Sequence, residues 1–268
     1  MLVNYHCHSI CSMDCDIPMA DMARAALSAG VRQVCFTDHC DTLDENGNFS
    51  PDAFSWDAEE REFALAREAV GDTMQLRLGV ELGEAVVHPD YAAQVLSHGH
   101  IDFVIGSVHA LADQPDFYFQ HYDSRERCLK LLGDYLDQML ALSQTDFYDV
   151  LGHITYPLRY MRVRDGVDVD LRPFDERVRE ILRTVVGRGR GIELNTSGYL
   201  NCGGEPMPPE YLLRQYRELG GEIITIGSDA HVPERMASYL AEGMELLRHV
   251  GFRYVTVFTG RKPEFIKL

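Results

Sequence analysis

Short runs of apolar and β-branched residues recur along the chain, and between them lie longer stretches in which apolar residues return every three or four positions. The short runs predict buried strands, and the longer stretches predict amphipathic helices. The predicted strands are Leu2–His6, Gln33–Thr37, Gln75–Glu81, Phe103–Ser107, Tyr148–Gly152, Gly191–Asn195, Glu222–Gly227 and Tyr254–Phe258. The predicted helices are Met19–Ala29, Ala58–Val70, Pro89–Ser97, Arg125–Ser143, Pro173–Gly187, Pro209–Leu219 and Glu234–Val250.

Strands and helices alternate, which favours an α/β fold with a parallel sheet and crossover helices. Two polar, turn-rich stretches interrupt the alternation and are expected to be loops. They are Asp41–Trp56, which we expect to lie over the functional site, and Asp113–Asp123, which is rich in Phe and Tyr. No change in composition marks a linker, so we expect a single domain over residues 1–268.

Histidines and carboxylates follow six of the predicted strands. They are His6, His8, His39, Glu81, His109, His153, Asp229 and His231, with Asp14 in the loop after the first strand. An open sheet offers a ligand crevice at one switch point, whereas a closed barrel brings every strand end to one rim. Polar residues after so many strands therefore favour a distorted, TIM-like barrel of seven strands.

Spacing also indicates which side chains share a face. His6 and His8 are two positions apart on a strand, so they point the same way. Asp38 directly precedes His39 and should point the opposite way. We therefore expect His39 to join the cluster and Asp38 to have a supporting role.

This mixture of imidazoles and carboxylates suits zinc, iron or manganese. Nine donors are more than one tetrahedral ion can use, which predicts two or three divalent ions. Such ions lower the pKa of bound water to about 7 and so favour hydrolysis. The nearby Cys7, Cys11 and Cys15 are expected to be small buried residues rather than soft ligands.

The chain has 268 residues and a formal net charge of -17, which disfavours nucleic acid as a partner. A small phosphorylated metabolite is compatible with this charge, because bound divalent ions reverse the sign locally. No apolar stretch approaches the roughly 20 residues of a membrane span, and we expect no signal peptide because the sequence enters a predicted strand at once. With seven cysteines that we expect to be reduced, these features favour a cytoplasmic protein without a membrane partner. The oligomeric state is not predicted.

In their order along the chain, His6-x-His8, Thr37-Asp38-His39, Glu81, His109, His153 and Asp229-x-His231 resemble the motifs of the PHP (polymerase and histidinol phosphatase) superfamily. The resemblance covers the whole chain and implies a distorted (βα)7 barrel. It implies one ion held by His6, His8, Glu81 and Asp229, and a second held by Glu81, His109 and His153. A third would be held by His39, His231 and Asp14, where many members have histidine; Asp16 is the alternative to Asp14.

Two segments, 151–160 and 193–198, are similar to the histidinol-phosphatase branch of that superfamily. The implied reaction is hydrolysis of L-histidinol phosphate to L-histidinol and phosphate in histidine biosynthesis, with a metal-bound hydroxide as nucleophile. Arginine suits phosphate oxygens because it makes bidentate contacts. The expected substrate contacts are Arg159, Arg162, Asn195 and His121. Glu193 shares a strand face with Asn195 and is expected to enter the pocket as well, and a structural role for Asn195 stays open as an alternative.

Other functions stay open at this point. A phosphodiesterase or exonuclease, or a phosphatase for another small ester, would use the same metal site. A non-catalytic metal-binding scaffold is a further alternative. Degraded sites lose ligands, whereas all nine positions here carry a competent one, which argues against the scaffold.

Overall fold

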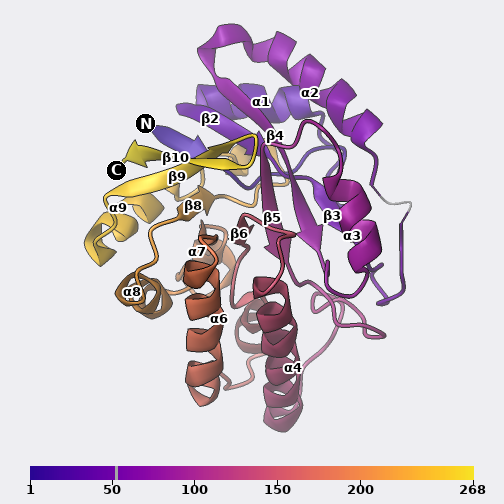
Figure 1. The fold of residues 1–268 in the computed structure, drawn as a ribbon, viewed down its shortest axis with the longest axis vertical. Helices are drawn as coiled ribbons and strands as arrows, with labels where there is room; N and C mark the ends of the chain where they lie inside the picture. Colours follow the sequence, from indigo (N-terminus) through magenta and orange to yellow (C-terminus); the bar gives the residue numbers. More distant parts are fainter. Residues whose placement is uncertain (52–53) are drawn as a thin grey trace.

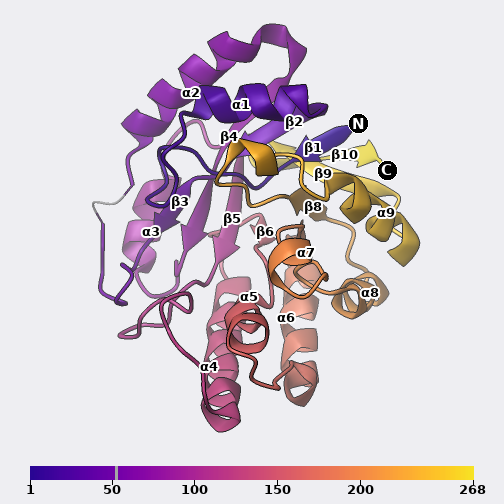
Figure 2. The ribbon, with the colours of Figure 1, turned by 180° about the vertical axis from the view of Figure 1, so that it is seen from behind.

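Parallel strands form the centre of the molecule and curve into a nearly closed barrel (Figures 1 and 2). The structure, a computed structural model, describes residues 1–51 and 54–268. Within these ranges, seven strands pair in the order β1-β2-β4-β5-β6-β7-β8. Their bounds are β1 Leu2–Asn4, β2 Val31–Phe36, β4 Gln75–Gly83, β5 Phe103–Ser107, β6 Val150–Leu151, β7 Gly191–Asn195 and β8 Ile224–Gly227. A short extra strand, β3 (His39–Asp41), pairs in parallel with β4.

The barrel closes between β8 and the chain at the end of β1. Tyr5 donates its backbone N–H to the carbonyl of Ile226 at 2.9 Å, and Asp229 donates to the carbonyl of His6 at 2.8 Å. These bonds bring the carboxyl ends of the first and last barrel strands together. The expected distorted barrel of seven strands is therefore confirmed.

Helices cover the outside of the barrel, and α1 and α2 lie side by side over one part of it (Figure 2). The longer helices are α1 Met19–Ser28, α2 Trp56–Val70, α3 Pro89–Leu96, α4 Arg125–Ser143, α6 Asp175–Gly187, α8 Glu210–Glu218 and α9 Leu240–Val250. Short helical turns are η1 Gly71–Thr73, α5 Tyr156–Leu158, the π-helix η2 Arg159–Arg164, η3 Arg172–Phe174, α7 Gly198–Asn201 and η4 Pro233–Arg235. Across the described part of the chain, no helix is long and apolar enough to cross a membrane.

Six of the seven predicted helices are found with nearly the same bounds, but the prediction of one helix over Glu234–Val250 is wrong. The chain makes the short turn η4, and α9 begins only at Leu240. Tyr239, just before α9, has a φ of 57°, in the left-handed region. An L-residue in that conformation cannot continue a right-handed helix.

The last predicted strand, Tyr254–Phe258, is present as β9 (Tyr254–Thr259) but lies outside the parallel sheet. It forms an antiparallel hairpin with β10 (Lys262–Lys267), an unpredicted strand whose residues are mostly exposed. Arg261 lies in the turn between β9 and β10, and its Nε donates to the carboxylate of Asp149 at 3.1 Å. Asp149 directly precedes β6. The hairpin thus packs against the amino-terminal end of the barrel, and the opposite end carries the polar cluster.

The described residues of the two predicted loops contain no helix apart from Trp56, which begins α2, and Asp41 ends strand β3. Glu45, from the first loop, lines the cavity at the carboxyl-terminal end of the barrel, as do Tyr118 and Phe119 from the second. Residues 52 and 53, which belong to the first predicted loop, lie outside the described residues.

Candidate metal centre

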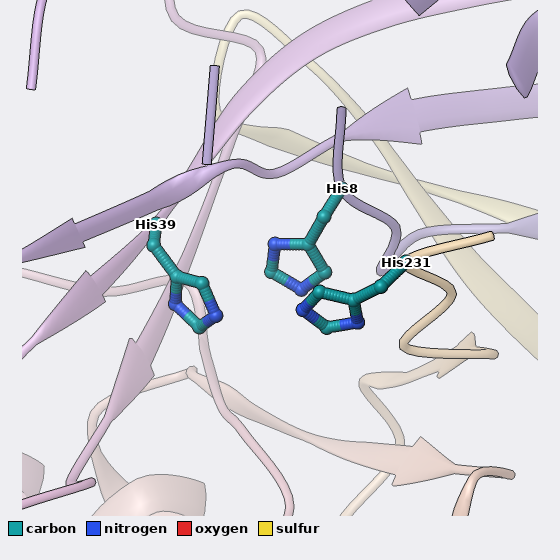
Figure 3. A group of neighbouring side chains, drawn as sticks. All are labelled: His8, His39 and His231. Atoms are coloured by element: carbon teal, nitrogen blue, oxygen red, sulfur yellow. The ribbon is translucent and has the colours of Figure 1, made fainter. Parts of the chain in front are cut away.

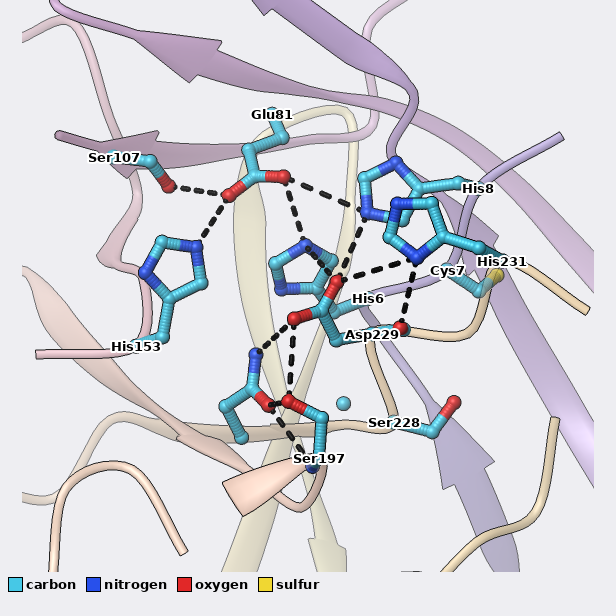
Figure 4. A network of polar contacts seen from close by, with 12 residues as sticks. His6, Cys7, His8, Glu81, Ser107, His153, Ser197, Ser228, Asp229 and His231 are labelled. Atoms are coloured by element: carbon cyan, nitrogen blue, oxygen red, sulfur yellow. Dashed lines mark hydrogen bonds and ion pairs between the residues drawn. The ribbon is translucent and has the colours of Figure 1, made fainter. Parts of the chain in front are cut away.

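The carboxylate of Glu81 contacts side chains from several segments of the polar cluster, among them His6, His8 and His153 (Figure 4). Glu81 belongs to β4 and is fully buried. Its Oε2 lies 2.9 Å from Nε2 of His6, and its Oε1 lies 2.8 Å from Nε2 of His153. Ser107, at the end of β5, donates its hydroxyl to Oε1 at 2.6 Å. Because the two oxygens face different histidines, Glu81 can join two neighbouring groups of ligands.

The first group combines residues from the two strands that close the barrel. His6 and His8 follow β1 and are fully buried. Asp229 follows β8, and its Oδ1 lies 3.3 Å from Nε2 of His8. The φ of Asp229 is 53°, in the left-handed region that Asp adopts more readily than most residues. This turn places the carboxylate of Asp229 beside His8, where β8 meets the end of β1.

The second group lies on the other side of Glu81. His109 follows β5, and its Nε2 lies 3.3 Å from Oε1 of Glu81 and 3.2 Å from Nε2 of His153. Two imidazole nitrogens and one carboxylate oxygen therefore face the same small space.

The third group contains three histidines from separate segments (Figure 3). The ring of His8 stacks on His39 at 4.3 Å and on His231 at 4.1 Å between centroids. Oδ2 of Asp14 lies 3.0 Å from Nε2 of His231. Asp14 also lines the cavity, whereas Asp16 is exposed and is not among the described residues that line it.

The donor atoms are close enough for metal ions. In four sets of three residues, one donor atom from each lies within 4.8 Å of the other two; the sets are His8-His39-His231, His6-His8-Glu81, His39-Asp41-His109 and Glu81-His109-His153. Nε2 of His8 and Nδ1 of His39 are buried without a hydrogen-bond partner among the described residues. Buried nitrogen atoms normally have a partner, and a cation between these donors would supply it. The cluster can therefore hold metal.

Charges in the cluster keep its carboxylates ionised. Burial alone would raise the pKa of Glu81 and of Asp229, but the surrounding histidines, with His6 foremost, hold both pKa values well below the ordinary range. Burial, and then the neighbouring His231, lowers the pKa of His8 well below its ordinary value. Ionised carboxylates beside a neutral imidazole are the forms that coordinate a cation. Burial alone would lower the pKa values of His6 and His109, but facing carboxylates, Glu193 and Asp41 foremost, raise both well above the ordinary range, so a bound cation would displace their protons.

Two further carboxylates orient the histidines. Oε1 of Glu193 lies 2.7 Å from Nδ1 of His6, and its Oε2 accepts the backbone N–H of His153 at 2.8 Å. Asp41 lies 3.2 Å from Nδ1 of His109. Glu193 was expected to enter the pocket because it shares a strand face with Asn195, whereas Asp41 had no predicted role in the site. The available signal was spacing, because Asp41 lies two positions after a candidate ligand on an extended segment.

A cavity of about 670 Å³ opens onto the cluster. Its walls are strongly charged: Arg159 and Arg235 contribute positive groups, and Glu45 and Asp116 contribute carboxylates. Aromatic and apolar side chains at the wall are Met13, Tyr118, Phe119, Tyr156, Tyr160, Leu200 and Val232. The cavity can therefore bind a small molecule that carries both signs of charge.

Of the four expected substrate contacts, the structure brings only Arg159 to this cavity. Arg162 lines a separate pocket of about 180 Å³ on the other side of the π-helix. Asn195 is fully buried, and its amide donates to Asp229 at 3.3 Å, so it supports the cluster instead. The side chain of His121 is 90% exposed and is absent from the described lining residues.

Comparison with known families gives a match over most of the barrel. Residues 4–197 match the family model described as the PHP domain. The histidinol-phosphatase of Lactococcus lactis is 26% identical, and the match covers 97% of this chain and 95% of that protein. A probable histidinol-phosphatase of Deinococcus radiodurans is 31% identical, with 98% of each chain covered.

Solved structures agree with this result. The crystal structure of histidinol phosphate phosphatase from Lactococcus lactis, complexed with zinc, L-histidinol and phosphate, superposes with a TM-score of 0.83. It is 26% identical, and the match covers 98% of each chain. The crystal structure of a protein from Listeria monocytogenes described as a putative histidinol phosphatase is 18% identical and shares the fold with a TM-score of 0.73. The match covers 89% of this chain and 99% of that one.

Proposed function

The chain belongs to the PHP domain family, and from this membership we propose that it is a metal-dependent phosphomonoesterase that hydrolyses L-histidinol phosphate to L-histidinol and phosphate. The observation that carries the proposal is the convergence of histidine and carboxylate donors on the floor of a charged cavity. Relatives that match along nearly their whole length are named for this reaction. The proposal also makes the chain an enzyme of histidine biosynthesis.

We assign the ions to the three groups around Glu81. The first would be held by His6, His8, Glu81 and Asp229, the second by Glu81, His109 and His153, and the third by Asp14, His39 and His231. Zinc is the first candidate, because the Lactococcus lactis enzyme was crystallised with it. When bound, such ions polarise phosphoryl oxygens and lower the pKa of water to about 7.

Arg159 would bind the phosphate of the substrate. Its guanidinium lies over the ring of Tyr160, with 5.5 Å to the centroid, and faces the cavity. No carboxylate within the described chain forms an ion pair with Arg159, so its charge is available to a dianionic ligand. A phosphate held there would sit between a fixed positive charge and the metal-binding floor, which orients phosphorus for attack.

The carboxylates of Glu45 and Asp116 would face the other end of the substrate. Both line the cavity, and Asp116 lies 3.5 Å from the hydroxyl of Tyr156. L-Histidinol carries an ammonium group, and its imidazole is partly protonated near neutral pH. A cavity with arginine at one wall and carboxylates at another therefore matches a substrate with phosphate at one end and a cation at the other.

Phosphate release from a set of substrates tests the proposal. The purified, zinc-loaded protein is expected to hydrolyse L-histidinol phosphate with a higher kcat/KM than bis(p-nitrophenyl) phosphate, short oligonucleotides or other small monoesters. A preference for the diester or the oligonucleotides would support a phosphodiesterase instead. If none of the esters is hydrolysed, the result would favour the alternative that the protein is a non-catalytic metal-binding scaffold. Elemental analysis of the same preparation gives the identity and number of the ions.

A further inference from the structure

A second group of donors includes a residue of the loop that carries His8, and none of its members is among the described residues that line the cavity. It contains Cys11, Asp38 and Glu59, from the loop after β1, the chain after β2 and helix α2. One donor atom from each lies within 4.8 Å of the other two. Neither Cys11 nor Glu59 takes part in the centre around Glu81.

The carboxylate of Glu59 is the unusual member. Its residue is only 1% exposed, and neither oxygen has a hydrogen-bond partner among the described residues. What lies next to it is the carboxylate of Asp38 and the thiol of Cys11. Two ionised carboxylates cannot be buried side by side, because each loses its hydration and repels the other. Either a proton on Glu59 or a metal cation must therefore lie between them.

Asp38 differs from Glu59 in that its hydrogen bonds are satisfied. It accepts from the backbone N–H and the hydroxyl of Ser9 and from the hydroxyl of Ser12 at 2.7 Å. These donors fix the position of the carboxylate. Asp38 is thus a preformed ligand, whereas Glu59 is the member of the cluster that lacks a hydrogen-bond partner among the described residues.

We propose that Cys11, Asp38 and Glu59 form a separate cation site that takes a thiophilic divalent ion such as Zn²⁺. Thiolate sulfur and carboxylate oxygen are both common ligands of zinc, and water can complete a tetrahedral site. Access is available, because Cys11 lines a surface pocket of about 260 Å³ together with Ser55, Ala58 and Glu62. Without an ion, burial raises the pKa of the Cys11 thiol to about 12, and burial and the charge of Asp38 raise the pKa of Glu59 to about 10, so the arriving cation replaces one proton on each.

Sulfur distinguishes this site from the main centre, whose assigned ligands are only histidines and carboxylates. Metal-free protein titrated with Co²⁺ until all sites are filled is expected to show a thiolate-to-cobalt charge-transfer band in the near ultraviolet. The band should disappear in Cys11→Ser and persist in Cys15→Ser, the matched change in the same loop. A wild-type protein without the band, or a band that survives Cys11→Ser, would overturn the proposal.

A second variant tests the carboxylate. Glu59→Gln keeps the shape of the side chain and is expected to bind one ion fewer than the wild type by elemental analysis. If Glu59 and Asp38 only share a proton, the ion count will not change, and the cation site is disproved. Neither readout uses phosphatase activity, so this result and the test of the proposed function are independent.

Discussion

Nδ1 of His8 lies 3.0 Å from the hydroxyl of Ser12, and this contact determines which nitrogen of His8 carries the proton. The hydroxyl has one hydrogen, which it donates to the carboxylate of Asp38 at 2.7 Å. Nδ1 must therefore donate to the oxygen of Ser12, and Nε2 keeps its lone pair. That lone pair faces Asp229 and Glu81, where a metal ligand is needed.

Ser12→Ala should weaken metal binding because it removes the group that orients His8. Loss of such an outer partner typically costs roughly 10- to 100-fold in metal affinity or activity. Chelator competition would measure the affinity. Ser9→Ala is the matched control, since the hydroxyl of Ser9 also donates to Asp38, whereas Nδ1 of His8 is paired with Ser12. Equal effects of the two changes would mean that Asp38, and not His8, is what Ser12 supports.

Glu193→Gln should reduce kcat by roughly 10- to 100-fold with little change in KM. Glu193 accepts bonds from Nδ1 of His6 and from the backbone of His153. A glutamine would place its NH₂ group against either Nδ1 of His6 or the backbone N–H of His153, and both of these are donors. It would also remove the negative charge that keeps a proton on Nδ1 of His6. Steady-state kinetics on L-histidinol phosphate would measure the effect. Wild-type kcat in this variant would show that His6 needs no orienting carboxylate.

Asp229→Asn should lower kcat by more than the roughly 100-fold expected for an outer partner, because it removes a proposed direct ligand. The fold should survive, since Asn tolerates the left-handed conformation found at this position. Circular dichroism would verify folding, and elemental analysis would report lost metal. His121→Ala is the control: its side chain is exposed and lies away from the cavity, so its kinetics should match the wild type. Retained turnover in Asp229→Asn would contradict the ligand assignment.

Much of the fold could be predicted from local pattern. Strands β5 and β7 and helix α4 have the predicted bounds, because continuous apolar runs and helical periodicity mark them clearly. β10 could not be predicted in this way, since its residues are mostly exposed and its order depends on pairing with β9. The break before α9 likewise depends on the left-handed conformation of Tyr239, which the hydrophobic periodicity of the sequence does not predict.

The cluster of candidate ligands was accessible to sequence reasoning because parallel strands of a barrel end at the same rim. The carboxylates that orient those ligands were harder to identify. Asp41 reaches His109 only because β3 pairs with β4, and Glu193 reaches His6 across the barrel interior. Contacts that depend on tertiary packing, including the burial of Asn195, leave no local pattern.

Arg159→Ala should raise the KM for L-histidinol phosphate by roughly 10- to 100-fold, because a hydrogen bond to a charged group contributes about 1.5–3 kcal/mol. The effect should be smaller on kcat, since the assigned metal ligands remain. Arg162→Ala is the matched control: it removes the same charge from the same π-helix, but its side chain lines a different pocket. Arg159→Lys should recover only part of the affinity, because an ammonium group cannot make the bidentate contact. Equal effects of the two alanine changes would indicate a general loss of positive charge and would remove Arg159 from the phosphate site.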